Sequence, residues 1–150
     1  MVEQTQARPI YVLLVEDDSD DFFLTQDALQ QVDEKKYAVV WAGTYDRART
    51  ALFEQKFDVA LVDYHIGDRT GLEFIAEMGS RYPGCPMILL TGVDNPDVDR
   101  AAEKAGAADF LVKDALTPDL LDRTIRYARQ HAERKALLSA VLENAGAGMI

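Results

Sequence analysis

The sequence of 150 residues contains one cysteine, no long apolar run and few basic residues. A single cysteine, Cys85, excludes a disulfide bond within the chain. No apolar run approaches the roughly 20 residues that a membrane-spanning helix needs. Residues 1–8 lack the basic start and the apolar middle of a secretory signal. We therefore expect a cytoplasmic protein with no part in the membrane.

The charge balance is strongly acidic. Sixteen Lys and Arg residues stand against 26 Asp and Glu residues, which gives a formal net charge of −10. Because phosphate backbones are bound by basic surfaces, this balance argues against nucleic-acid binding by the domain. The hydrophobic content of 48% is high enough for a folded core. A chain of this length is typical of a single domain.

Five short apolar segments alternate with amphipathic segments along the chain. They cover residues 10–15, 38–42, 59–62, 87–90 and 110–112. Each is too short for a helix and is typical of a buried strand. Strands that alternate with helices form parallel sheets with helices on both faces. We therefore predict a flavodoxin-like (βα)5 fold, a doubly wound parallel sheet with strand order 2-1-3-4-5.

The helix boundaries have recognisable signals. Asp18 or Ser19 can cap a first helix that runs to about residue 32, and a second helix is expected near 46–55. Thr70 and Glu73 form a capping box, and the helix that follows is expected to end at 83–84. Asn-Pro at 95–96 and Thr-Pro at 117–118 open the last two helices. Apolar residues expected on the buried faces include Phe22, Phe23, Leu24 and Phe53.

The last helix has an apolar pattern that continues beyond the domain. A fraying surface helix is one interpretation, and a helix that leaves the domain as a linker is the favoured one. We accordingly expect an extended C-terminal helix, with a flexible tail at residues 1–9, the folded domain at 10–130 and a helical linker toward a further domain at 131–150. The final residues suggest a fragment cut at the start of a further domain.

Reactive side chains follow four of the five predicted strands. Glu16 and Asp17 follow the first strand, Asp63 the third, Thr91 the fourth and Lys113 the fifth. In an open parallel sheet these ends share one edge, where such folds bind ligands. Each residue alone has an ordinary explanation, such as a solvated helix start or a surface lysine. Together they predict a crevice with three carboxylates, a hydroxyl and an amine.

Four motifs around these residues resemble the receiver domain of bacterial two-component response regulators. They are LLVEDD at 13–18, LVDY at 61–64 followed by TGLE at 70–73, LLTG at 89–92 and AADFLVK at 107–113. The resemblance covers about residues 10–130. Residues 143–150 also resemble the opening of a PAS-type sensor domain.

The resemblance implies a role for each site residue. Asp63 would accept a phosphoryl group, and Glu16, Asp17 and Asp63 would hold Mg²⁺, with Mn²⁺ as a substitute. Thr91 and Lys113 would contact the phosphoryl oxygens, and Thr91 and Phe110 would form the conformational switch. His65 and Val93 would tune the lifetime of the phosphoryl group.

The chemistry of phosphoryl transfer fits these residue types. A carboxylate that attacks phosphorus forms an acyl phosphate, as in aspartyl-phosphate enzymes. Catalysis of the transfer consists mainly of positioning and charge neutralisation. Mg²⁺ suits this purpose, because it binds one or two carboxylates together with phosphate and water. A lysine ammonium adds a second positive charge.

The sequence departs from the family pattern at three places. Asp114 follows the lysine where a proline is usual, and the loop after Asp63 also lacks its usual proline. Phe110 lacks the hydroxyl of a tyrosine at the switch position, so its ring tip makes no polar contact. These departures concern the signalling details more than the phosphorylation.

The favoured function is a phosphorylation switch that is not a turnover enzyme. A sensor histidine kinase or phosphotransfer protein would donate the phosphoryl group, and the C-terminal helix would signal to an output domain. Homodimerisation stays open. One alternative is a pseudo-receiver that binds partners without being phosphorylated. Another is a Mg²⁺-dependent phosphatase with an aspartyl-phosphate intermediate.

Overall fold

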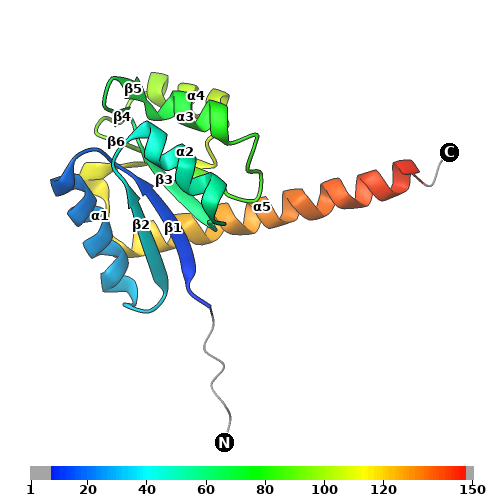
Figure 1. Cartoon of the computed structure of the whole chain (residues 1–150), viewed down its shortest axis with the longest axis horizontal. Helices are drawn as coiled ribbons and strands as arrows, with labels where there is room; N and C mark the ends of the chain where they lie inside the picture. The colour runs from blue at the N-terminus through cyan, green and yellow to red at the C-terminus, as the bar shows by residue number, and fades with distance from the viewer. Residues whose placement is uncertain (1–7, 148–150) are drawn as a thin grey trace, which may run out of the picture.

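Five parallel strands form the middle layer of the structure, a computed structural model that describes residues 8–147 (Figure 1). The strands are β1 (Ile10–Val15), β2 (Tyr37–Ala42), β3 (Val59–Asp63), β6 (Met87–Thr91) and β7 (Asp109–Val112). Their order across the sheet is β2-β1-β3-β6-β7. Since the labels β4 and β5 belong to a separate hairpin, this is the predicted order 2-1-3-4-5. The flavodoxin-like fold is therefore confirmed.

Helices cover both faces of the sheet. They are α1 (Ser19–Val32), α2 (Tyr45–Glu54), α3 (Gly71–Met78), α4 (Pro96–Ala105) and α5 (Pro118–Ala147), with a short 3-10 turn η1 (Lys113–Ala115). Alternate residues of a strand point to opposite faces. Leu13 and Val15 of β1 therefore share one core with α2, α3 and α4, while Val12 and Leu14 share the other with α1 and α5.

The predicted helix caps are present. The side chains of Asp18, Thr70, Asn95 and Thr117 each accept a hydrogen bond from a backbone N–H in the first turn of the helix that follows. A cap of this kind stabilises a protein by about 1 kcal/mol. Gly106 ends α4 in the left-handed conformation, with φ of 95°. The chain therefore starts its helices where the sequence predicted.

Three apolar residues lie outside the core, contrary to prediction. Phe23 and Leu24 of α1 are 61% and 68% exposed, and Phe53 of α2 is 83% exposed. A surface helix buries a stripe at spacings of three and four residues. In α1 that stripe contains Phe22, Thr25, Ala28 and Leu29, so the two residues after Phe22 point away from the sheet.

The end of α3 also differs from prediction. The helix ends at Met78, with Gly79 as its C-cap, before the Pro-Gly pair at 83–84. The residues between form turns, in which the N–H groups of Arg81 and Tyr82 both donate to the Met78 carbonyl. The proline and glycine therefore belong to the loop that leads into β6.

A small hairpin after β3 was not predicted. Strand β4 (His65–Ile66) pairs antiparallel with β5 (Arg69–Thr70), and Gly67 takes a φ of 63° in the turn between them. A positive φ of this size favours glycine. The hairpin closes at its base, where the Gly71 N–H donates to the Tyr64 carbonyl over 2.7 Å. It lies next to the carboxyl end of β3.

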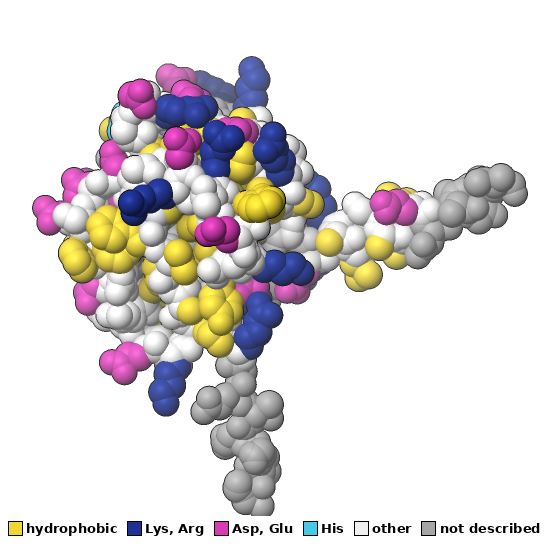
Figure 2. Space-filling model, viewed as in Figure 1, with side chains coloured by type: hydrophobic (Ala, Val, Ile, Leu, Met, Phe, Trp, Pro, Cys, Tyr) yellow, Lys and Arg dark blue, Asp and Glu magenta, His cyan; other side chains and the backbone are white. Residues whose placement is uncertain are grey.

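Helix α5 extends well beyond the body of the domain (Figure 1). Its 30 residues span about 45 Å at 1.5 Å per residue. Ala128 is the last of its buried hydrophobic residues, and the projecting part exposes Leu137, Leu138, Val141 and Leu142 (Figure 2). The predicted extended helix is confirmed. Residues 1–7 of the expected tail and residues 148–150 of the expected linker lie outside the described residues.

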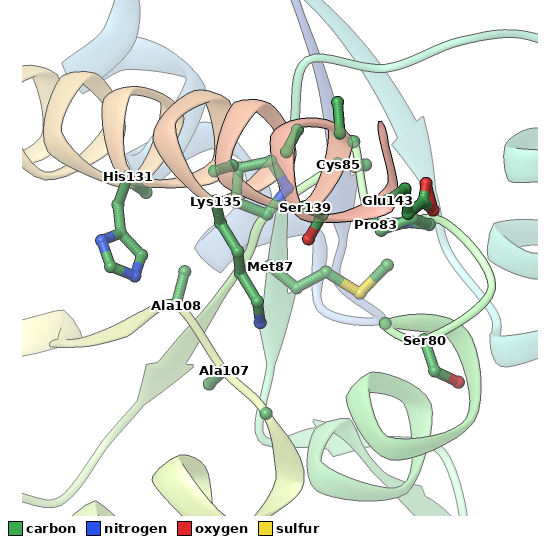
Figure 3. Close-up of a pocket in the computed structure, with 18 residues that line it drawn as sticks. Ser80, Pro83, Cys85, Met87, Ala107, Ala108, His131, Lys135, Ser139 and Glu143 are labelled. Carbon is green, nitrogen blue, oxygen red and sulfur yellow. The ribbon is translucent and has the colours of Figure 1, made fainter. Parts of the chain in front are cut away.

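A groove of about 680 Å³ lies at the edge of the sheet opposite the carboxyl ends of the strands (Figure 3). It runs between α5 and the loops that lead into β6 and β7, and small side chains such as Ala107, Ala108 and Ala132 line much of it.

No helix within residues 8–147 combines the length and the apolar character needed to cross a membrane.

Candidate functional site

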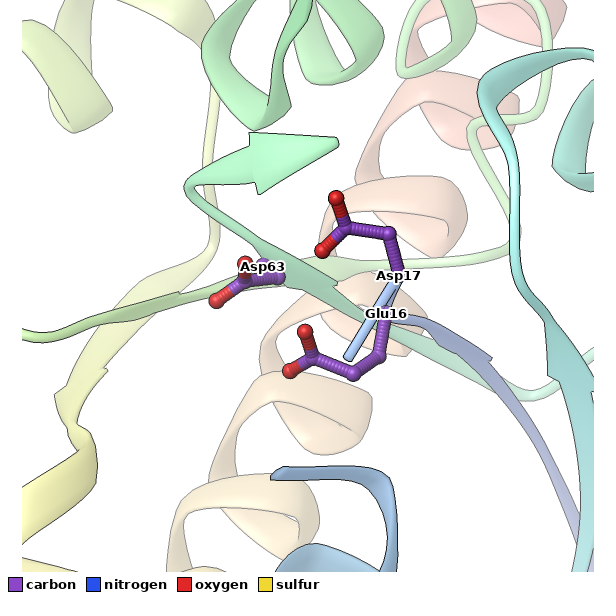
Figure 4. Close-up of side chains that lie close together, drawn as sticks. All are labelled: Glu16, Asp17 and Asp63. Atoms are coloured by element: carbon purple, nitrogen blue, oxygen red, sulfur yellow. The ribbon is translucent and has the colours of Figure 1, made fainter. Parts of the chain in front are cut away.

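Three carboxylates meet at the carboxyl ends of β1 and β3 (Figure 4). β1 pairs with β3 in a register that sets Val15 beside Val62, so Glu16 and Asp63 follow on neighbouring strands. One oxygen from each of Glu16, Asp17 and Asp63 lies within 4.8 Å of the others. Glu16 is fully buried and Asp63 is 5% exposed, whereas Asp17 is open to solvent.

Lys113 follows the edge strand β7, and its side chain extends into this cluster. Its Nζ atom lies 2.5 Å from Asp63 Oδ1 and 3.2 Å from Glu16 Oε1. It also donates a hydrogen bond to Asp21 Oδ2 over 2.6 Å. Burial alone would lower the pKa of Lys113, but the hydrogen bonds to Asp21 and Asp63, with the charges of Asp63 and Glu16, raise it. The lysine is therefore a fixed cation beside Asp63.

Glu16 is the residue whose electrostatics depart most from those of a solvated acid. Burial, together with the charge of Asp63, raises the pKa of Glu16 to about 7, against the opposing effect of Lys113. Its Oε1 atom is buried and accepts no hydrogen bond from any described residue. The Glu16 carbonyl accepts a hydrogen bond of 2.7 Å from the indole of Trp41, whose ring stacks on Phe22. The backbone of Glu16 is thus held, while its carboxyl is paired with Lys113 through Oε1 and accepts the Asp18 N–H on Oε2 over 3.3 Å.

This raised pKa predicts a pH dependence of stability without metal. Glu16 binds a proton in the folded protein at pH values where the unfolded chain has lost it, so its contribution is present below about pH 4.5 and disappears as pH rises to about 7. We expect the Tm of the wild type to fall by a few degrees relative to Glu16→Gln across this window. Thermal melts of both proteins in EDTA measure it. A pH-independent difference in Tm would contradict the assignment.

Backbone N–H groups of the hairpin complete the polar contacts of the acidic cluster. The His65 N–H donates to Asp63 Oδ2 over 3.2 Å, and the Gly67 N–H donates to Asp17 Oδ2 over 2.9 Å. Both donors belong to β4 and its turn. The hairpin therefore touches two of the three carboxylates.

The remaining residues singled out from the sequence lie around the cluster. Thr91, at the end of β6, is buried, and its hydroxyl exchanges hydrogen bonds of 3.2 Å with the N–H and carbonyl of Val93. The Val93 side chain is exposed. Phe110 of β7 is half-buried against the core shared with α2, α3 and α4. The His65 side chain is exposed and lies edge-on to the ring of Tyr64.

The donor set fits a hard divalent cation. Mg²⁺ prefers oxygen ligands and is usually held by one or two carboxylates together with waters and phosphate. Three carboxylates, from Glu16, Asp21 and Asp63, contact the ammonium of Lys113, and a fourth, from Asp17, lies close to those of Glu16 and Asp63. The site therefore carries excess negative charge, and Glu16 Oε1, which is buried beside Lys113 without a hydrogen bond from any described residue, is one of the oxygens open to a cation.

Sequence reasoning missed three contributors to the site. Asp21 was not among the predicted site residues; it lies in the first turn of α1 and is a direct partner of Lys113. The sequence contained one signal for this residue: it lies one helical turn after the N-cap of α1, on the side of the helix that carries Phe22 and Thr25. Gly67 and Gly71 act through their backbones. A Cβ at Gly71 would overlap the Asp63 carbonyl oxygen, so this glycine lets α3 begin directly against the end of β3.

Comparison with known proteins identifies the family. The sequence model of the response regulator receiver domain matches residues 12–125, and the chain belongs to this family. The chain is 32% identical over 142 residues to the alginate biosynthesis transcriptional regulatory protein AlgB of Pseudomonas putida, an alignment that covers 95% of this chain and 30% of AlgB. It is 31% identical over 118 residues to the hydrogenase transcriptional regulatory protein HoxA of Cupriavidus necator, covering 78% of this chain and 23% of HoxA. The chain thus spans less than a third of the length of these relatives.

Solved structures agree with the fold. A CheY-like receiver domain protein from Methanospirillum hungatei superposes with a TM-score of 0.73 at 23% identity, covering 85% of this chain and 99% of that protein. The chemotaxis response regulator CheY4 of Vibrio cholerae gives 0.70 at 26% identity, covering 81% of this chain and 99% of CheY4. The fold predicted from the sequence is therefore that of known receiver domains.

Proposed function

We propose that this receiver domain accepts a phosphoryl group on Asp63 in a Mg²⁺-dependent reaction. The observation that carries the proposal is the contact between Lys113 Nζ and Asp63 Oδ1 inside a cluster of three carboxylates, two of which are buried. An oxygen of Asp63 attacks phosphorus, a P–O bond forms, and the bond to the donor breaks with its electron pair staying on the donor. The ammonium of Lys113 balances charge on the phosphoryl oxygens.

Glu16, Asp17 and Asp63 would hold the cation, and Mn²⁺ could replace Mg²⁺ there. When bound, the cation would neutralise charge between Asp63 and the incoming phosphate. Lys113 would exchange its contacts with Asp63 and Glu16 for phosphoryl oxygens. The tether to Asp21 would keep the lysine within reach during that exchange.

Thr91 and Phe110 would form the switch. The Thr91 hydroxyl makes hydrogen bonds with the Val93 backbone. If it turned toward a phosphoryl oxygen these bonds would break, and the loop that leads to α4 would loosen. Phe110 is half-buried and could change rotamer as that loop moves. The exposed side chains of His65 and Val93 would tune access of water and hence the lifetime of the acyl phosphate. Such a response is a shift between two populations that a modification biases.

The wider assignment follows from the family and from α5. A sensor histidine kinase or phosphotransfer protein in the cytoplasm would supply the phosphoryl group, and an output domain would receive the signal through the projecting helix. Residues 10–130 would be the receiver, and residues 131–150 a linker toward that domain. The protein would thus be a signalling domain with no external substrate to turn over.

Incubation with acetyl phosphate tests the proposal. We expect the intact mass to rise by one phosphoryl group in the presence of Mg²⁺ and to stay unchanged in EDTA. A pseudo-receiver would show no increase under either condition. A phosphatase would turn over small phosphoesters such as p-nitrophenyl phosphate, which the wild type is expected to leave intact.

A further inference from the structure

The hairpin of β4 and β5 contacts the acidic cluster, and the inference drawn from these contacts presupposes the metal site of the proposed function. Its turn places the Gly67 N–H on Asp17 Oδ2, and its first residue places the His65 N–H on Asp63 Oδ2. Asp17 is the exposed member of the cluster, and an exposed side chain gains most from a partner that fixes its orientation. The position of the hairpin tip therefore controls how Asp17 presents its oxygens.

The tip is fixed from outside the site by a stack of two side chains. The guanidinium of Arg69 lies over the ring of Tyr45, with its Cζ atom 3.6 Å from the ring centroid. Arg69 Nε also contacts Glu73 Oε2 over 3.1 Å. Ile66, opposite Arg69 in the hairpin, is buried in the core. Residues directly opposite each other in an antiparallel pair share one face, so the face that buries Ile66 in the core is also the face that stacks Arg69 on Tyr45 of α2.

Tyr45 is a rigid platform for this stack. Its side chain is buried, its ring lies edge-on to Phe74, and its hydroxyl donates a hydrogen bond of 2.6 Å to Glu77 Oε1. Cation–π contacts are strongest where a ring is held in place and partly shielded from water. An arginine stack on a fixed ring can therefore hold the hairpin in one position.

We propose that Arg69 and Tyr45 are positioning residues for the divalent cation. Their stack holds the hairpin so that the Gly67 N–H fixes one oxygen of Asp17, which leaves the other oxygen for the cation. Neither residue touches the cation. Groups that orient metal ligands in this way typically contribute 10- to 100-fold to metal affinity.

The substitution Arg69→Met separates this role from simple electrostatics. Loss of a positive charge near an acidic site would by itself strengthen cation binding. Loss of the stack releases the hairpin and weakens binding. We expect the Kd for Mg²⁺ to rise about tenfold, at the lower end of the usual range for such groups. The two explanations therefore predict changes of opposite sign.

Titration of the full chain with MgCl₂ measures the effect. Trp41 is the only tryptophan and its indole donates to the Glu16 carbonyl, so its fluorescence reports on the site. The NMR signal of the Gly67 amide reports the bond to Asp17, and we expect Arg69→Met to shift it before any metal is added. Arg49→Met is the matched control, because Arg49 contacts Asp46 and Glu77 in the same region. Its Kd should stay within twofold of the wild type.

Two variants of Tyr45 complete the test. Tyr45→Phe keeps the ring and should retain most of the affinity, whereas Tyr45→Leu removes it and should weaken binding as much as Arg69→Met. If the wild type binds Mg²⁺ and Arg69→Met binds equally or more tightly, the positioning role is wrong while the metal site stands. If the wild type does not bind Mg²⁺, the metal site itself is wrong and the positioning role falls with it.

Discussion

Asp63→Asn is expected to abolish phosphorylation by acetyl phosphate completely. The amide has almost the same shape as the carboxylate, but its oxygen is not a nucleophile and it binds neither Lys113 nor a divalent cation as an anion does. The wild-type carboxylate is 5% exposed, and it contacts Lys113 Nζ and the His65 N–H. The measurement is intact mass after incubation with acetyl phosphate and Mg²⁺.

Asp20→Asn is the control for this prediction. Asp20 lies in the first turn of α1, its side chain is exposed, and it belongs to none of the contacts of the acidic cluster. The Asp20→Asn variant should be phosphorylated to the same extent as the wild type. An Asp63→Asn protein that still gained one phosphoryl group would show that another side chain is the acceptor, and the assignment would have to move to that residue.

The fold could be predicted because its signals are local and repeated. Each strand is a short apolar run, and in the three central strands the run is buried on both faces, as from Val12 to Val15 in β1. The caps that start the helices are read directly from side-chain chemistry. Once the strand order is known, the meeting of Glu16 with Asp63 follows from the topology alone.

Contacts made across the sheet edge could not be predicted in this way. The position of Asp21 in α1 indicates which side of the helix it occupies, but its contact with Lys113 depends on how closely α1 approaches the end of β7, a distance that no local pattern encodes. The hairpin of β4 and β5 has only two residues in each strand, too few for a visible alternation. The exposed Phe23 and Leu24 show the same limit, since an apolar run of three residues on a helix cannot face one side.

Two features of the sequence therefore determine the site: the side chains at the strand ends and the backbone that positions them. Residue types at strand ends define the charges, and the backbone around them defines where those charges lie. Gly71 belongs to the second of these features. It is the first residue of α3, and its backbone passes so close to β3 that a side chain would overlap the Asp63 carbonyl oxygen and lie 3.1 Å from Val62 Cγ1.

Gly71→Ala is accordingly expected to destabilise the fold more than the same methyl addition at any other glycine whose surroundings the structure describes. The atom in the way is backbone, which cannot turn aside as a side chain can, so the overlap should cost about 3 kcal/mol, the upper end for an overpacked core. The higher helix propensity of alanine compared with glycine offsets at most about 1 kcal/mol of this loss in the free energy of unfolding. The net loss of about 2 kcal/mol corresponds to a fall in Tm of roughly 4–8 °C for a domain of this size.

The comparison that isolates this effect is Gly84→Ala. A Cβ at Gly84 would have no atom within 4 Å, so the same chemical change should leave the Tm within about 2 °C, as expected for a surface substitution. Because the overlap pushes on the backbone of Asp63, Gly71→Ala should also slow phosphorylation by acetyl phosphate at temperatures where the variant is fully folded. Equal melting temperatures for the two variants would mean that α3 can shift away from β3 without cost, and the close approach at Gly71 would then not define the position of Asp63.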